Sequence, residues 1–83
     1  MIDPPLSHNY TLPRMRQIDI EHNGKSWGYA IVSQSYRLDS TEIAVYRNDG
    51  SEVGYFRHND LMSEETAKEI VMDYLKAIKA WEI

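Results

Sequence analysis

The last quarter of the sequence, residues 63–83, has apolar side chains at steps of three and four. They are Ala67, Ile70, Val71, Tyr74, Leu75, Ile78 and Trp81. This spacing places them on one stripe of an α-helix, with charged side chains on the rest of the circumference. Ser63 can cap the helix, and Glu64 and Glu65 suit the positive end of the helix dipole. The pattern predicts one amphipathic C-terminal helix that needs an apolar surface to pack against.

Two segments with alternating apolar and polar residues flank Asn23-Gly24. An Asn-Gly pair is a strong signal for a two-residue type I′ hairpin turn, because both central residues need positive φ. Segments 14–22 and 25–34 are therefore predicted to pair as antiparallel strands, with Ile20 opposite Trp27. In this register the apolar residues of both strands share one face: Ile18, Ile20, Trp27, Tyr29 and Ile31.

A second hairpin is predicted around Asn48-Asp49-Gly50, which suits a three-residue loop with Gly50 in the left-handed conformation. Its strands are segments 41–47 and 51–56. They extend the first apolar face if the loop before them holds an odd number of residues, such as 36–40. The residues added to that face are Ile43, Val45, Val53 and Tyr55.

The predicted elements fit one domain, because 83 residues hold too little apolar material for a second core. The three prolines lie within residues 1–13, which are predicted to form an extended N-terminal arm that carries His8. Residues 14–83 are predicted to form a single α+β domain. The expected fold is ββββα: a four-stranded antiparallel meander with one C-terminal helix packed on one face, in two layers.

The charge balance narrows the expected partners. Thirteen acidic against nine basic residues leave a net charge of −4, which argues against direct nucleic-acid binding and favours a basic protein partner. The chain has no cysteine, which fits a reducing compartment. No apolar run approaches the ~18 residues of a membrane span, and the N-terminus lacks a signal-peptide pattern. We therefore expect a cytoplasmic protein with no membrane partner.

Few residues in the sequence suggest catalysis or cofactor binding. No glycine-rich phosphate loop precedes the helix, and the histidines lack a recognised metal-ligand spacing: His8, His22 and His58. His58 and Asp60 could act together in general base catalysis. Asn59 and Asp60 favour a plain turn before the helix, which explains the same residues without catalysis. We expect no catalytic residue, no cofactor and no metal, with a small His/Asp enzyme as the alternative.

The side of the predicted sheet that faces away from the helix carries every acidic strand residue together with large apolar groups. The residues assigned to it are Met15, Asp19, Glu21, Val32, Glu42, Tyr46, Glu52 and Phe56. Apolar anchors within a charged surround are typical of an interface. A water-facing side of an antiparallel sheet also takes such residues without any function. The partner-binding residues predicted here are Asp19, Glu21, Glu42, Tyr46, Glu52 and Phe56.

The functional hypothesis is a small, non-enzymatic protein-binding module that docks this acidic and aromatic face on the basic surface of a larger protein. If that surface normally holds nucleic acid, the module would inhibit by competition. Its size and charge are typical of phage or mobile-element inhibitors of bacterial defence complexes, an analogy without a motif. The alternative is a structural role, in which the protein forms a homodimer that hides Tyr46 and Phe56 from water.

Overall fold

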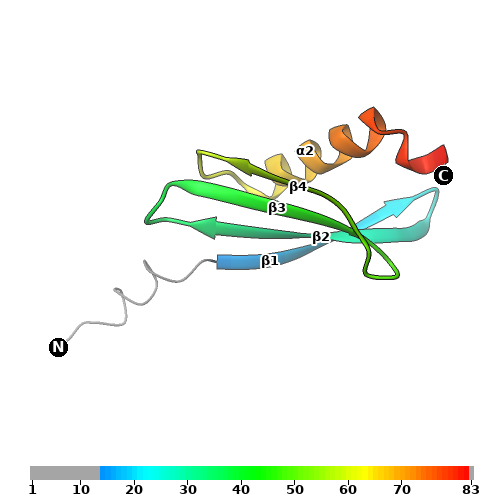
Figure 1. Ribbon diagram of the computed structural model, residues 1–83, viewed down its shortest axis with the longest axis horizontal. Helices are drawn as coiled ribbons and strands as arrows, with labels where there is room; N and C mark the ends of the chain where they lie inside the picture. Colours follow the sequence, from blue (N-terminus) through cyan, green and yellow to red (C-terminus); the bar gives the residue numbers. More distant parts are fainter. Residues whose placement is uncertain (1–13, 83) are drawn as a thin grey trace.

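The computed structural model describes residues 14–82, which form one sheet and one helix (Figure 1). The strands are β1 (Arg14–His22), β2 (Lys25–Ser35), β3 (Ser40–Arg47) and β4 (Glu52–His58). The helix α2 (Glu64–Ala77) is followed by a short 3₁₀ helix, η1 (Ala80–Glu82). The predicted N-terminal arm, residues 1–13, lies outside the described residues, and so does Ile83.

The strands form one antiparallel sheet in the order β1-β2-β3-β4, and α2 lies across one of its faces (Figure 1). The predicted α+β class and the ββββα order are confirmed. We call the side of the sheet that packs against α2 the inner face and the opposite side the outer face. Within residues 14–82, no helix is both long and apolar enough to cross a membrane.

The start and the buried stripe of α2 follow the sequence pattern. The Ser63 side chain accepts a hydrogen bond from the backbone N–H of Thr66 at 3.1 Å, so Ser63 caps the helix as predicted. Below the cap, one stripe is fully buried: Ala67, Val71 and Leu75. The helix ends at Ala77, earlier than predicted, and Ile78 keeps 37% of its surface exposed.

Beyond the helix, a residue in the left-handed region redirects the chain toward the sheet. Lys79 has φ of 55°, and η1 then buries Ala80 and half-buries Trp81. The Trp81 ring lies 5.5 Å from Trp27 in an edge-on arrangement and stacks on His22 at 4.2 Å. Because α2 starts where β4 ends, the sequence predicts that the helix returns toward the Asn23-Gly24 turn and brings Trp81 near Trp27. The contact between the two rings confirms this prediction.

Both hairpin turns have the predicted backbone conformations. Asn23 and Gly24 have φ of 55° and 76°, as a type I′ turn requires, and Gly50 has φ of 88°. In the second turn, the Asp49 carboxylate accepts hydrogen bonds from the Ser51 hydroxyl at 2.7 Å and the Ser51 backbone N–H at 2.9 Å. These bonds favour the charged form and lower the pKa of Asp49.

A β-bulge interrupts the predicted register of the first hairpin two residue pairs away from its turn. His22 pairs with Lys25 as predicted, but Ile20 pairs with Gly28 and not with Trp27, which is the extra residue. A Cβ at Gly28 would overlap the backbone of β3, so only glycine permits this close approach. The bulge keeps Trp27 beside the C-terminal segment while the rest of β2 is shifted by one residue.

This shift exchanges the two faces of β2. Ala30 and Val32 are buried on the inner face, whereas Tyr29 and Ile31 lie on the outer face. The predictions that Tyr29 and Ile31 face the helix and that Val32 faces outward are therefore wrong. A one-residue slip moves every following side chain to the opposite face, because the side-chain period of a strand is two.

A second bulge lies in β4, where Val53 is the extra residue. Val45 pairs with Gly54 and not with Val53, so every residue from Gly54 onward changes face. Tyr55 lies on the outer face and Phe56 on the inner face, the reverse of the prediction. A Cβ at Gly54 would overlap the end of the Tyr74 side chain of α2, so any other residue here would displace that ring.

The connection between the hairpins compensates for the first bulge. Ser35 pairs with Ser40, which leaves four residues, 36–39, between β2 and β3 where an odd number was predicted. With β2 already shifted by one residue, this even loop turns Ile43 and Val45 to the inner face, as predicted. The core then consists of Ile18, Ile20, Ala30, Val32, Ile43, Val45, Ala67, Val71, Leu75 and Ala80.

Candidate protein-binding face of the sheet

The outer face is built from three rows of residues, each crossing all four strands at directly paired positions. The tyrosine row consists of Asp19, Tyr29, Tyr46 and Glu52. The central row consists of Gln17, Ile31, Ala44 and Tyr55. The glutamate row consists of Met15, Ser33, Glu42 and Arg57.

The tyrosine row has two stacked rings at its centre and a carboxylate at each end. Tyr29 and Tyr46 have ring centroids 5.2 Å apart and planes inclined by 23°. Both side chains are half-buried, whereas Asp19 and Glu52 are exposed. Because neighbouring strands hold these residues in register, the row has a fixed order: carboxylate, ring, ring, carboxylate.

A hydrogen bond links the other two rows. The Tyr55 hydroxyl donates to Glu42 Oε1 at 2.7 Å, and Arg57 is paired directly with Glu42 on the neighbouring strand. The bond favours the neutral phenol and raises the pKa of Tyr55. Tyr55 keeps 56% and Met15 64% of their surface exposed, so both side chains are available to a partner.

The outer face is acidic. Asp19, Glu21, Glu42 and Glu52 contribute four negative charges and Arg57 one positive charge, which gives the face a net charge of −3. Between the charges lie the half-buried apolar and aromatic groups of β2 and β3, among them Ile31. The arrangement suits contact with a cationic surface that also offers apolar or aromatic atoms.

Five of the six predicted partner-binding residues lie on this face: Asp19, Glu21, Glu42, Tyr46 and Glu52. Phe56 does not, because the bulge at Val53 turns it to the inner face, where its ring lies 5.5 Å from Tyr74 of α2.

Sequence reasoning also missed three outer residues: Tyr29, Ile31 and Tyr55. The available signal was a single glycine inside each affected strand, Gly28 in β2 and Gly54 in β4. Such a glycine often marks a bulge or a close backbone approach.

The segment with His58 and Asp60 connects β4 to α2 and is fixed through its backbone. The hydroxyl of Thr41, a fully buried residue, donates to the carbonyl of Asp60 at 2.7 Å, and Gln34 donates to the carbonyl of Met62. His58 is exposed, with its ring edge-on to Phe56 at 6.1 Å. These contacts give the segment a structural role at the entrance to the helix.

No three histidine, aspartate or glutamate side chains of residues 14–82 gather in a way that could hold a metal ion. His22 is engaged in stacking on Trp81, at the opposite end of the sheet from His58.

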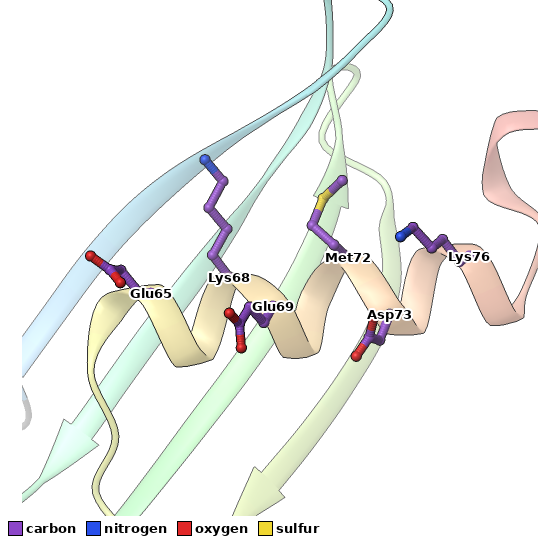
Figure 2. A pocket seen from close by; sticks show the side chains of 6 residues that line it. All are labelled: Glu65, Lys68, Glu69, Met72, Asp73 and Lys76. Atoms are coloured by element: carbon purple, nitrogen blue, oxygen red, sulfur yellow. The ribbon is translucent and has the colours of Figure 1, made fainter.

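A shallow hollow also lies along the solvent side of α2 (Figure 2). It is lined by Glu65, Lys68, Glu69, Met72, Asp73 and Lys76. In Figure 2 the side chains of Lys68 and Met72 point to one side of the helix axis, and those of Glu69 and Asp73 point to the other. Three carboxylates and two ammonium groups alternate at helical spacing, as on an ordinary solvated helix flank. The hollow therefore favours no ligand of one charge.

The sequence matches no protein-family model, and comparison with curated proteins and with solved structures gives no match. Among the surfaces of the chain, the outer face combines a net charge of one sign with aromatic groups accessible to a partner.

Proposed function

We propose that this protein is a non-enzymatic binding module whose outer face docks on a basic surface of a larger protein. The observation that carries the proposal is a sheet face over which no helix of residues 14–82 lies, with Tyr29 and Tyr46 on its two middle strands and carboxylates around them. Aromatic groups supply most of the binding energy at many interfaces, and they work best where surrounding groups exclude water. Here Tyr29 and Tyr46 lie on the two middle strands, with a carboxylate position on either side.

The charge of the face supports a basic protein partner over a nucleic acid. A net charge of −3 on the face repels phosphates, whereas it attracts lysine-rich or arginine-rich surfaces and speeds association with them. If the partner's basic surface normally holds nucleic acid, the module competes for it. A module that competes in this way would suit a phage or mobile-element inhibitor of a bacterial defence complex. Only the size and charge of the chain support this more specific role.

A symmetric homodimer through the same face is a weaker alternative on charge grounds. A twofold interface brings the same patch of both copies together, so carboxylates would oppose carboxylates. Like charges juxtaposed at an interface cost several kcal/mol. Sedimentation velocity of the pure protein distinguishes the two cases, since the proposed module stays monomeric without its partner.

The proposal is tested by capturing the partner from a host lysate and titrating it with a charge-reversed face. Glu42→Lys with Glu52→Lys brings the net charge from −4 to zero, because each reversal adds two units. At low salt we expect the double variant to bind about tenfold more weakly than the parent, and less so at high salt.

The matched control reverses two carboxylates on the solvent side of α2, Glu69→Lys with Asp73→Lys, and produces the same net charge. This control should retain most of the parent affinity. Equal losses in the two double variants would mean that overall charge, and not the outer face, governs binding. The location of the site on the sheet would then be wrong.

A further inference from the structure

The tyrosine row offers a more specific site than a general acidic surface. Tyr29 and Tyr46 stack on each other, so each ring uses one face for the pair and turns the other toward a flanking strand. On β1 the residue paired with Tyr29 is Asp19, and on β4 the residue paired with Tyr46 is Glu52. The outer ring face of each tyrosine thus turns toward a strand position that holds a carboxylate.

From this arrangement, and resting on the proposed function, we propose that the tyrosine row receives two arginine side chains of the partner protein, one at each end. A guanidinium is planar and weakly hydrated, so it stacks on a tyrosine face while its N–H groups reach a carboxylate in the same plane. A lysine ammonium has no plane to stack and holds its water more strongly. The row therefore selects arginine over lysine.

The same chemistry already occurs elsewhere within the chain. The guanidinium carbon of Arg47 lies over the Trp27 ring, 4.9 Å from its centroid. On the outer face, one oxygen of Asp19 accepts a hydrogen bond from Nε2 of Gln17, which lies on the same strand, at 3.1 Å. This bond orients the carboxylate and leaves its other oxygen for a ligand. One end of the row is thus held in position by a neighbour on its own strand.

The stacked pair also sets the spacing of the two arginines. The ring centroids are 5.2 Å apart, and a stacked group lies about 3.5–4 Å beyond each ring, so the guanidinium groups would lie roughly 12 Å apart. Residues i and i+4 of an extended peptide are separated by about 13 Å. An extended segment with arginines four positions apart therefore fits the row.

The probe is the blocked peptide Arg-Gly-Gly-Gly-Arg, compared with Lys-Gly-Gly-Gly-Lys, in NMR titrations that follow the ring signals of Tyr29 and Tyr46. We expect both rings to shift and the arginine peptide to bind about two- to fivefold more tightly than the lysine peptide. Tyr46→Leu, which keeps apolar bulk and charge, should reduce this preference to near one. Glu52→Gln should weaken both peptides. The matched control is Tyr36→Leu in the loop between β2 and β3, which should retain the full preference.

The outcomes separate this inference from the proposed function. If both peptides shift the outer face equally, arginine selection is wrong and the basic-partner proposal stands. If neither peptide shifts an outer-face residue at the highest concentration reached, both proposals are overturned. A parent protein that sediments as a dimer with these tyrosines protected from solvent also overturns both. Backbone amide spectra of each variant establish that the fold is retained.

Discussion

On the inner face of the sheet, Ile20, Ile43 and Val45 are at most 1% exposed, whereas on the outer face Tyr55 keeps 56% of its surface in contact with solvent. The same four strands carry both sets of side chains, one residue apart. The inner face is filled by small and branched aliphatic residues because α2 lies directly over it. No helix of residues 14–82 lies over the outer face, which carries aromatic and charged groups of the kind found at binding interfaces.

One side of the sheet thus stabilises the fold, and the other side is available for binding. Substitutions on the inner face should alter unfolding, and substitutions on the outer face should alter binding with little effect on unfolding. The two bulges create this division, because without them Tyr29 and Tyr55 would point at the helix. The following experiments test that division.

The largest expected difference is between the same substitution on the two faces. Ile43→Ala removes a fully buried side chain under α2 and should cost about 2–5 kcal/mol of unfolding free energy. Ile31→Ala, one strand away on the outer face, should cost less than half as much, since its side chain is only partly buried. Urea unfolding measures both. Equal costs would contradict the exposure of the outer face and indicate that another surface covers it in solution.

Gly28→Ala tests the bulge that turns Tyr29 outward. The added methyl group would overlap the Tyr46 carbonyl of β3, so we expect a loss of about 1–3 kcal/mol in unfolding free energy. Ser33→Ala on the outer side of the same strand is the control and should stay within about 0.5 kcal/mol. A stable Gly28→Ala variant would show that β2 and β3 do not approach as described, and the placement of Tyr29 would fail.

Ser63→Ala removes the N-terminal cap of α2, the helix that covers the inner face, and changes no residue of the outer face. Losing the side-chain acceptor for the Thr66 N–H should cost about 1 kcal/mol, seen as a lower thermal midpoint. The ring signals of Tyr29 and Tyr46 should not move in NMR spectra. Movement of those signals would mean that α2 and the outer face are coupled.

The smallest expected effect is a change in the pKa of Tyr55 on the outer face. The Glu42 acceptor stabilises the neutral phenol of Tyr55, so the pKa of Tyr55 is higher in the folded than in the unfolded chain. This contribution to stability is present below the unfolded value of about 10 and is lost as pH rises through the folded pKa. Glu42→Ala should lower the pKa of Tyr55 toward about 10, measured by NMR of the ring carbons. Glu69→Ala on α2 should leave it unchanged, and a shift with this control would contradict the assigned cause.

The sequence alone determined the elements and their order, because the signals for them are local. Asn23-Gly24 and Gly50 specify turns through their backbone conformations, and Ser63 specifies the helix start through one hydrogen bond. The apolar stripe through Ala67, Val71 and Leu75 needed an apolar surface to pack against, and the sheet was the available one. It followed that Trp81 would approach Trp27, since the helix has only one direction in which to return.

Tertiary packing decided which side chains of β2 and β4 face the helix. Trp27 and Ala30 can both lie on the helix side only because β2 bulges at Trp27, and the close approaches at Gly28 and Gly54 depend on β3 and α2, which are distant in the sequence. Alternation within one strand is satisfied equally well in either register, so it could not distinguish Tyr29 outward from Tyr29 inward. The carboxylates of the candidate site were therefore predictable, because they lie on β1, on β3 and ahead of the bulge in β4. Its tyrosine pair and the inward turn of Phe56 depended on how the whole sheet packs against the helix.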